Sequence, residues 1–355
     1  MLSLEQAIKR VGRLDEQAMK AAQQRQDSLI KPLGSLGRLE ELSIKVAGIR
    51  GYPIPAMDRK AIVVMAADHG VVAEGVSLYP QAVTPQMVRN FLQGGAAINV
   101  LARHVDARVL VVDMGVAAEL EPCEGLVSRK IAHGTRDLVR GPAMSQGEAI
   151  SAIEAGLEIL EQEVEKGLDI IGTGDMGIGN TTSSSAITAA ITGAPVAKVT
   201  GRGAGLGRRQ LAGKVHAVEE ALSVNRPDAA SGVDVLTKVG GFEIAGLAGL
   251  MIGAAGHRLP IVIDGFISGA AALVATTMAP RLRDFLIAGH VSAERGHRAA
   301  LKHLGLKPVL DLDMRLGEGT GAALAISVVE AAVKALAGMA TFAQAGVSEA
   351  EKRAE

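Results

Sequence analysis

The 355-residue sequence contains no tryptophan, and aromatic residues make up only 2% of it. It has 43 glycines and 48% hydrophobic residues, so we expect a core of small and aliphatic side chains in which backbones approach closely. Because Cys123 is its one cysteine, no disulfide can form within the chain, and folding does not depend on an oxidising compartment. These features favour a cytoplasmic protein.

The sequence also lacks an excess of charge of one sign. Its 37 basic and 38 acidic residues give a formal net charge of −1, which offers no electrostatic attraction to nucleic acid or to an anionic membrane. The N-terminal segment carries charges from Glu5 onward and lacks the apolar stretch of a signal peptide. Of the two most apolar segments, 244–255 is too short to span a bilayer and 261–279 is interrupted by Asp264. We therefore predict small-molecule partners, no nucleic acid and no membrane.

Short apolar runs that end in polar or glycine turns alternate with helical patterns along most of the chain. The runs predict buried parallel strands at 61–70, 107–116, 168–180, 194–205 and 259–266. The helical patterns cover 84–103, 146–166, 181–192, 208–223 and 242–256. This alternation predicts an α/β fold, a parallel sheet layered with helices.

The two ends of the chain are predicted to be helical. Residues 3–50 have helical periodicity that is broken at the turn 31–37, and 319–340 has the pattern of a long helix. We expect segments 1–55 and 319–355 to form a small helical domain, and 56–318 to form the large α/β domain.

Ligands of parallel α/β sheets bind beyond the carboxyl ends of the strands. The predicted strand ends carry Asp68, Asp113, Asp175, Arg202 and Asp264. The sequence therefore predicts a polar site at this edge of the sheet.

Two glycine-rich loops are candidates for binding phosphate. The first, 172–182, matches G-x-G-x-x-G but lacks both the ribose-binding carboxylate of a dinucleotide site and the Lys-Ser/Thr of a Walker loop. Its backbone N–H groups and the hydroxyls of Thr181 and Thr182 could surround a phosphate monoester; the alternative is a tight turn with Asn180 as the helix N-cap. The second loop, 200–214, ends near Lys214, which is either a point charge for the phosphate or a solvated helix residue.

Other polar residues have simpler interpretations. Asp68 and His69 lack a third metal ligand at the usual spacing, so we predict a structural hydrogen bond. Tyr79 and Gln86 are candidates for a pocket that accepts a flat ring, because one offers an aromatic face and the other an amide. Charged neighbours indicate a solvated helix for His290, His297 and His303. Cys123 has neither a glycine elbow nor a paired histidine motif, so it is not a predicted nucleophile.

Several sequence blocks together resemble a known family. They include "KPLGSLGRLE", "ADHGV", "YPQAVT", "GTGDMGIGNTT", "GRGAGL", "DGFISGAAAL" and "LDLDMRLGEGTGAAL". In order and spacing, from about residue 27 to the end, they are similar to the nicotinate-nucleotide:dimethylbenzimidazole phosphoribosyltransferases of cobalamin synthesis. The resemblance implies a Rossmann-like large domain, a small helical domain, a homodimer, and nicotinate mononucleotide and 5,6-dimethylbenzimidazole as substrates.

The resemblance also assigns roles to individual residues. It implies that Glu318 is the general base. It places phosphate and ribose binding on Asp175, Gly177, Gly179, Gly203 and Lys214, and benzimidazole binding on Tyr79, Gln86 and Leu316. Asp175 stands where some members have glutamate, which preserves charge but shortens reach, and Tyr79 is larger than its counterpart in others.

The implied chemistry suits these residue types. Nicotinate mononucleotide carries a cationic pyridinium leaving group, so its departure needs little acid assistance. The attacking benzimidazole must lose an N–H proton, and a carboxylate within about 3 Å is a suitable acceptor. No metal and no cofactor are expected. From local pattern alone, the favoured interpretation of Glu318 is a stabilising charge at a helix N-terminus; the two glycine loops, the ring pocket and the family resemblance change this in favour of the general base.

Overall fold

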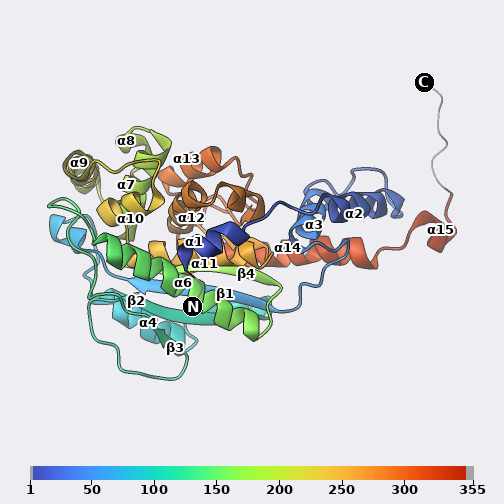
Figure 1. Ribbon diagram of the computed structural model, residues 1–355, viewed down its shortest axis with the longest axis horizontal. Helices are drawn as coiled ribbons and strands as arrows, with labels where there is room; N and C mark the ends of the chain where they lie inside the picture. Colours follow the sequence, from blue (N-terminus) through green and yellow to red (C-terminus); the bar gives the residue numbers. More distant parts are fainter. Residues whose placement is uncertain (1–2, 349–355) are drawn as a thin grey trace. The chain divides into compact units, whose positions relative to one another are not determined.

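The computed structural model describes residues 3–348, which contain a six-stranded sheet in the order β3-β2-β1-β4-β5-β6 (Figure 1). Every neighbouring pair is parallel. The strands are β1 (Lys60–Ala67), β2 (Ala107–Gly115), β3 (Leu126–Ser128), β4 (Ile170–Met176), β5 (Ile261–Ile263) and β6 (Leu286–Ala288). This order is that of a doubly wound Rossmann-like sheet, whose strand order reverses between β1 and β4. The predicted α/β class is confirmed.

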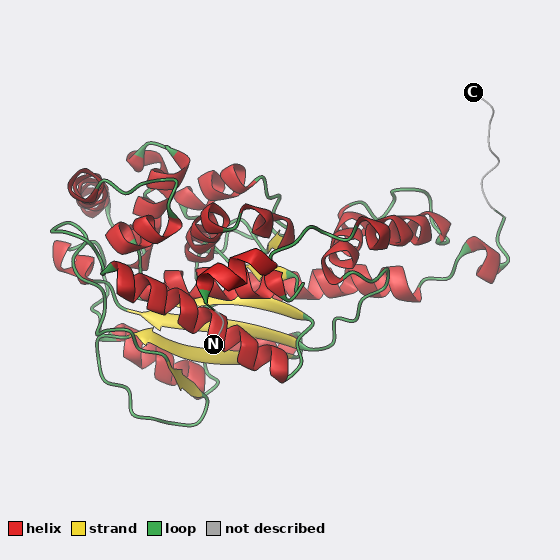
Figure 2. Cartoon of the chain, in the orientation of Figure 1, coloured by secondary structure: helices red, strands yellow, loops and turns green. Residues whose placement is uncertain are grey.

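Helices connect and cover the strands (Figure 2). They are α1 (Leu4–Arg10), α2 (Glu16–Ser28), α3 (Arg38–Arg50), α4 (Val83–Leu92), α5 (Ala97–His104), α6 (Gln146–Glu165), α7 (Asn180–Thr192), α8 (Val196–Val199), α9 (Arg208–Asn225), α10 (Gly232–Val239), α11 (Phe242–Gly256), α12 (Phe266–Met278), α13 (Arg295–Leu304), α14 (Thr320–Gly338) and α15 (Phe342–Ala345), with 3₁₀ turns η1 (Gly70–Glu74) and η2 (Pro280–Phe285).

Alternate residues of β1 contact helices on opposite faces of the sheet. On one face, Met65 packs against Gly246 of α11. On the other face, Ile62 packs beside Gly172 of β4 and Gly319 at the start of α14. All eight residues of β1 are buried. The near-continuous apolar runs of the sequence therefore reflect strands covered on both faces.

Close helix packing explains the many glycines and few aromatics. A Cβ at Gly156 of α6 would overlap the carbonyl oxygen of Gly246 in α11, and a Cβ at Gly249 would overlap that of Ile153. The two helices are thus in backbone contact, as the composition predicted.

Three details of the predicted secondary structure are wrong. Segment 194–205 is not a strand, because after Pro195 the chain forms the four-residue helix α8. The predicted helix 84–103 is two helices, α4 and α5, separated at Gly94, whose φ is 76°. Strands β3 and β6, of three residues each, were not predicted. The equally short β5 was predicted because it lies within the longer apolar run 259–266.

The chain divides into two compact units. The larger contains the residues up to Gly12 and Arg59–Ile326, and the smaller contains Arg13–Asp58 and the residues from Ser327 onward. Helix α1, which the sequence analysis placed in the small helical domain, packs against α6 and α11 in the larger unit. Residues 1–2 and 349–355 of the expected small domain lie outside the described residues.

The smaller unit is helical and contains a buried ion pair. The Lys31 ammonium lies 2.8 Å from Glu40 Oε1, and both side chains are buried. The Arg25 guanidinium donates to the carbonyls of Leu336 (2.6 Å) and Ala337 (2.7 Å), which stabilises the last turn of α14.

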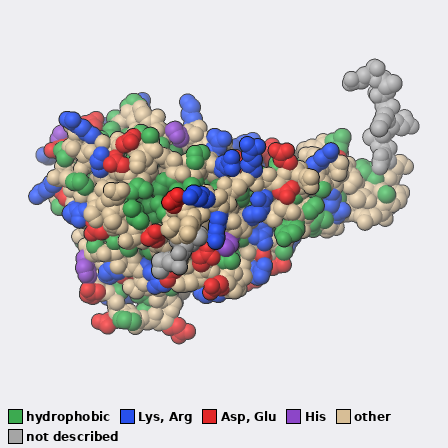
Figure 3. Space-filling view, viewed as in Figure 1, with side chains coloured by type: hydrophobic (Ala, Val, Ile, Leu, Met, Phe, Trp, Pro, Cys, Tyr) green, Lys and Arg blue, Asp and Glu red, His purple; other side chains and the backbone are tan. Residues whose placement is uncertain are grey.

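Helix α14 is long and apolar enough to cross a membrane by length and composition, and half of its most apolar window is buried within the protein. A core helix of a water-soluble protein has the same properties. The face seen in Figure 3 carries both basic and acidic side chains.

Candidate active site

A cavity of about 550 Å³ is lined by residues that follow the carboxyl ends of β1, β4, β5 and β6. Its wall consists of residues from 76–87, 175–181, 203–206, 265–267, 290–294 and 315–318. Open α/β sheets bind ligands in this place, beyond the strand ends and near the reversal of strand order. The cavity brings together most of the predicted site residues.

The backbone around Glu318 is left-handed at three consecutive positions. The φ angles are 89° at Gly317, 63° at Glu318 and 92° at Gly319. For glutamate this conformation costs about 1–3 kcal/mol, and such strain is concentrated at functional sites. The Glu318 N–H donates to the carbonyl of Asp175 (3.3 Å), and a Cβ at Gly174 would lie only 2.5 Å from the Glu318 carbonyl oxygen. The end of β4 therefore holds Glu318 in its strained position.

The Glu318 carboxylate is not the cap of the helix that follows it. Its Oε2 accepts a hydrogen bond from the N–H of Ile98 at the start of α5 (3.3 Å). The α14 N-terminus is capped instead by Asp264, which follows β5. Asp264 accepts from the N–H groups of Gly319 (3.1 Å), Gly321 (2.7 Å) and Ala322 (3.1 Å).

The Glu318 side chain lines the cavity although the residue is only 6% exposed. Burial raises the pKa of Glu318 above the ordinary value, and the charge of Asp264 raises it further. The hydrogen bond from Ile98 lowers the pKa, but its effect is smaller than that of burial. Burial is therefore the largest of these effects. A carboxylate with a raised pKa is a stronger proton acceptor.

Asp175 lies beside Glu318 at the end of β4. Its Oδ2 accepts from the Asn180 amide (3.0 Å), and its buried Oδ1 has no partner within residues 3–348. Burial, followed by the charges of Asp264 and Glu243, raises the pKa of Asp175 well above its usual range. The cavity thus contains two neighbouring carboxyl groups whose pKa values are both raised, that of Asp175 more strongly.

The first glycine loop packs against His69 and ends where α7 begins. Gly179 has a φ of 100° and is the N-cap of α7, so Asn180 is not the cap that the alternative interpretation of this loop required. A Cβ at Gly177 would overlap the carbonyl oxygen of Ala67, which explains the need for glycine. Gly177, Gly179 and Thr181 line the cavity at this helix N-terminus. Thr182 is buried outside that lining.

The second glycine loop follows α8 and not a strand end, which corrects the predicted arrangement. It nevertheless meets the first loop. Lys214 is 1% exposed, and its ammonium donates to Thr181 Oγ1 (2.7 Å). Both atoms lie next to the backbone of Gly203. Burial lowers the pKa of Lys214 to about 8, and the Glu294 charge opposes this shift. The interpretation of Lys214 as a solvated residue is therefore wrong.

The predicted ring pocket is partly assembled. Tyr79 and Leu316 line the cavity and remain about half exposed. Gln86 is exposed and lies outside the lining, which includes Val83 and Met87 from the same helix. The amide of Gln86 suits a ring pocket, but its position on α4 puts the side chain outside the cavity lining.

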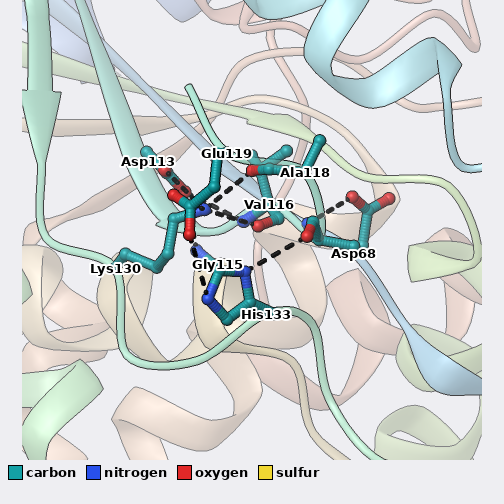
Figure 4. Close-up of polar contacts among 9 residues, drawn as sticks. Asp68, Asp113, Gly115, Val116, Ala118, Glu119, Lys130 and His133 are labelled. Atoms are coloured by element: carbon teal, nitrogen blue, oxygen red, sulfur yellow. Dashed lines mark hydrogen bonds and ion pairs between the residues drawn. The ribbon is translucent and has the colours of Figure 1, made fainter. Parts of the chain in front are cut away.

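Two other strand-end aspartates stabilise loops. Asp68 accepts from the Thr84 hydroxyl (2.6 Å) and from the N–H of Ala117 (2.9 Å), as predicted for a structural role. Asp113 lies 3.4 Å from the Lys130 ammonium, which also donates to the carbonyls of residues 116 and 118 (Figure 4). Both aspartates lie outside the cavity lining.

Arg202, which was predicted to lie at a strand end, follows the short helix α8 instead; it is exposed and lies outside the lining. His69, the neighbour of Asp68, forms a buried pair with Glu243 in which Nε2 and Oε1 are 2.7 Å apart. Neither His69 nor Arg202 therefore faces the cavity.

The loop between β6 and α13 contributes site residues that were not predicted. His290, Ser292 and Glu294 are all buried and line the cavity. His297 is also buried, its Nδ1 accepts from the N–H of Ser292 (2.9 Å), and burial lowers its pKa to about 3. The interpretation of His290 and His297 as solvated helix residues is therefore wrong. Recognition of β6 would have placed His290 and Ser292 at a strand end.

Within residues 3–348, no group of three or more His, Cys, Asp or Glu side chains is placed to hold a metal ion. What the cavity does offer is a helix N-terminus, two glycine loops with a buried lysine behind them, and a strained carboxylate. A helix N-terminus with a nearby cation is suited to a phosphate group.

Comparison with known proteins identifies the class. The sequence profile of a family described as Phosphoribosyltransferase matches residues 11–347, so the chain belongs to this phosphoribosyltransferase family. The nicotinate-nucleotide–dimethylbenzimidazole phosphoribosyltransferase of Chloroflexus aggregans is 59% identical over 349 residues, which are 98% of this chain and 99% of that protein. The protein of the same name from Geobacter sulfurreducens is 52% identical over 351 residues, 99% of this chain and 100% of that protein.

A solved structure is similar to this chain over most of the length of both. The crystal structure of CobT from Thermus thermophilus matches with a TM-score of 0.91 and 49% sequence identity, covering 94% of this chain and 100% of that one. The family resemblance found in the sequence blocks is confirmed.

Proposed function

We propose that this protein transfers the phosphoribosyl group of nicotinate mononucleotide to 5,6-dimethylbenzimidazole. The products are α-ribazole 5′-phosphate, which supplies the lower ligand of cobalamin, and nicotinate. The similarity to enzymes with this name extends over 98% of the chain. One observation carries the proposal: the Glu318 side chain is buried in a cavity that both glycine loops also line. The backbone of Glu318 is held in a strained left-handed conformation there.

Glu318 is the general base in this proposal. The benzimidazole attacks C1′ through one ring nitrogen, and the other ring nitrogen loses its proton to the carboxylate. The raised pKa of Glu318 brings its proton affinity closer to that needed at neutral pH. Attack on the face opposite the leaving group converts the β-nucleotide into an α-product. As the bond between C1′ and the pyridinium nitrogen breaks, its electron pair neutralises that nitrogen and nicotinate leaves, so the departure needs no metal and no cofactor.

The glycine loops hold the phosphate. The N–H groups at Gly177 and Gly179 lie at the N-terminus of α7, where the helix dipole favours an anion. The Lys214 ammonium, behind Gly203 and bonded to Thr181, adds a positive charge. Anchoring the phosphate orients C1′ for attack, which is the main contribution of binding to the rate.

The benzimidazole ring lies against an apolar part of the same cavity. Tyr79 and Leu316 contact the ring in this proposal, together with Val83 and Met87 of α4. Gln86 is not included, because it lies outside the lining. Asp175, beside Glu318, faces the phosphoribosyl group.

We also propose that the protein is a cytoplasmic homodimer, as the sequence resemblance and the lack of a possible intrachain disulfide suggest. Light scattering coupled to size-exclusion chromatography tests the dimer. A monomer at micromolar concentration would contradict it.

The decisive experiment incubates the protein with nicotinate mononucleotide and dimethylbenzimidazole and measures α-ribazole phosphate by chromatography and mass. Glu318→Gln should reduce turnover about 10²–10⁴-fold, the usual contribution of a general base, while nicotinate mononucleotide still binds. Glu220→Gln, at an exposed position on α9, is the matched control and should retain the full rate. Absence of product between about pH 6 and 10 would refute the function, and a near-normal rate for Glu318→Gln would refute the role of Glu318.

A further inference from the structure

Glu294 is a third buried carboxylate in the cavity, besides Glu318 and Asp175, and the proposed reaction does not yet use it. It lies between β6 and α13, lines the cavity, and is 6% exposed. It occupies the N-cap position of α13, yet its side chain makes no capping hydrogen bond. Its buried Oε2 has no hydrogen-bond partner within residues 3–348.

An unpaired buried carboxylate oxygen requires an explanation, because most buried polar atoms have a partner. Leaving such an acceptor unsatisfied costs more than leaving a neutral one. The site is nevertheless built around this carboxylate, since a Cβ at Gly201 would overlap Glu294 Oε2. The backbone of Gly201 therefore provides the space that Glu294 occupies.

The chemistry of the two substrates restricts what Glu294 can bind. A carboxylate accepts hydrogen bonds and repels anions. The phosphate and the nicotinate carboxylate are anions without donors at neutral pH, and the benzimidazole N–H is the proton that Glu318 receives. The remaining donors are the 2′- and 3′-hydroxyls of the ribose.

We propose that Glu294 binds the ribose of the phosphoribosyl donor by accepting a hydrogen bond from its 2′- or 3′-hydroxyl. This inference rests on the proposed function. Glu294 is placed for the contact because it packs against Gly201, its charge acts on Lys214, and it lines the same cavity as Gly203. Lys214 and Gly203 hold the phosphate of the same ribose in the proposed function.

The contact should strengthen in the transition state. As the pyridinium leaves, positive charge develops on C1′ and the ring oxygen, and the hydroxyls become better donors. Hydrogen bonds to a sugar 2-hydroxyl strengthen in this way in glycoside hydrolysis. A buried negative charge beside the ring also stabilises the developing positive charge. Loss of Glu294 should therefore lower kcat more than it raises KM.

A different role is that Glu294 acts only through Lys214. Its charge raises the pKa of Lys214, against the larger effect of burial, and so helps to keep the lysine protonated. Removal of Glu294 would then weaken phosphate binding and leave the ribose unaffected. The two roles predict different responses to the hydroxyls of the substrate.

The test compares Glu294→Gln with the unmodified protein on three donors: nicotinate mononucleotide and its 2′-deoxy and 3′-deoxy analogues. Glutamine preserves size, and circular dichroism checks folding. With the parent donor we expect kcat/KM to fall about 10- to 100-fold, the cost of losing a charged hydrogen bond. With the analogue that lacks the contacted hydroxyl, the variant and the unmodified protein should differ less than about threefold. Glu220→Gln is the control and should match the unmodified protein on all three donors.

Two results would overturn the inference. One is an equal loss on all three donors, which would indicate an effect through Lys214 or on the fold. The other is no loss with the parent donor. If the unmodified protein itself yields no product from the parent donor, the proposed function fails first, and calorimetric binding of the three donors then tests Glu294 without turnover.

If Glu294→Gln does not fold, Glu294→Asp replaces it. The shorter side chain keeps the charge but withdraws the carboxylate from the ribose. It should show the same dependence on the hydroxyl, and an equal loss on all donors would again refute the contact.

Discussion

Replacement of Asp264 by asparagine tests how the site is held together. The carboxylate accepts three backbone hydrogen bonds at the start of α14, from Gly319, Gly321 and Ala322. The residue is fully buried and His290 Nε2 is 3.5 Å away. These bonds position the helix that follows Glu318.

The size of the effect follows from these contacts. An asparagine oxygen can still accept from Gly321 and Ala322, which share Oδ1, but its NH₂ group then faces the N–H of Gly319. The unpaired buried donor costs about 1–3 kcal/mol. Loss of the negative charge at the helix N-terminus costs up to about 2 kcal/mol more. We expect Asp264→Asn to lower the free energy of unfolding by about 2–4 kcal/mol.

Equilibrium urea denaturation measures this change, with Ser231→Ala as the matched control. Ser231 caps α10 through one hydrogen bond to the N–H of Asp234 (3.3 Å), and its loss should cost about 1 kcal/mol. If Asp264→Asn were no more destabilising than Ser231→Ala, the three bonds would not organise the site.

The same variant should alter the pH dependence of activity. The Asp264 charge raises the pKa of both Glu318 and Asp175. Its removal should lower the pKa of Glu318, so that the base remains ionised at lower pH. The acid limb of the kcat profile should therefore move to lower pH, and a shift to higher pH would contradict the electrostatic argument.

Three further predictions concern stability. Because burial raises the pKa of Glu318 in the folded state, its charge costs stability at pH values above the unfolded-state pKa of about 4.3; Glu318→Gln should be more stable than the unmodified protein in urea at pH 8, with no advantage at pH 4. Gly156→Ala would overlap the carbonyl of Gly246 and should lower the free energy of unfolding by about 1–3 kcal/mol; an unchanged value would mean that α6 and α11 separate freely. Lys31→Ala leaves Glu40 buried without its cation and should cost about 3–5 kcal/mol, measured by the same denaturation.

Much of the large unit could be predicted from local sequence. Strands β1, β2 and β4 are continuous apolar runs because helices cover both faces of the sheet. The glycine loop after β4 is recognisable because positive φ angles and close backbone approach require glycine at fixed spacings. Motif blocks along most of the chain identified the family for the same reason, since each block preserves one local geometry.

The roles of single side chains depended on the tertiary structure. Lys214 and His297 have charged neighbours in sequence, yet both side chains are buried. They lie on the sides of α9 and α13 that pack against elements distant in sequence. Asp264 caps a helix 55 residues further along the chain, a contact that no local pattern contains. The sequence by itself determined the fold class and the family, and it singled out Glu318 as the candidate general base. Only the tertiary structure decided that Glu318 is strained and buried, and that Glu294 joins it in the same cavity, because burial and electrostatics depend on residues that are distant in sequence and close in space.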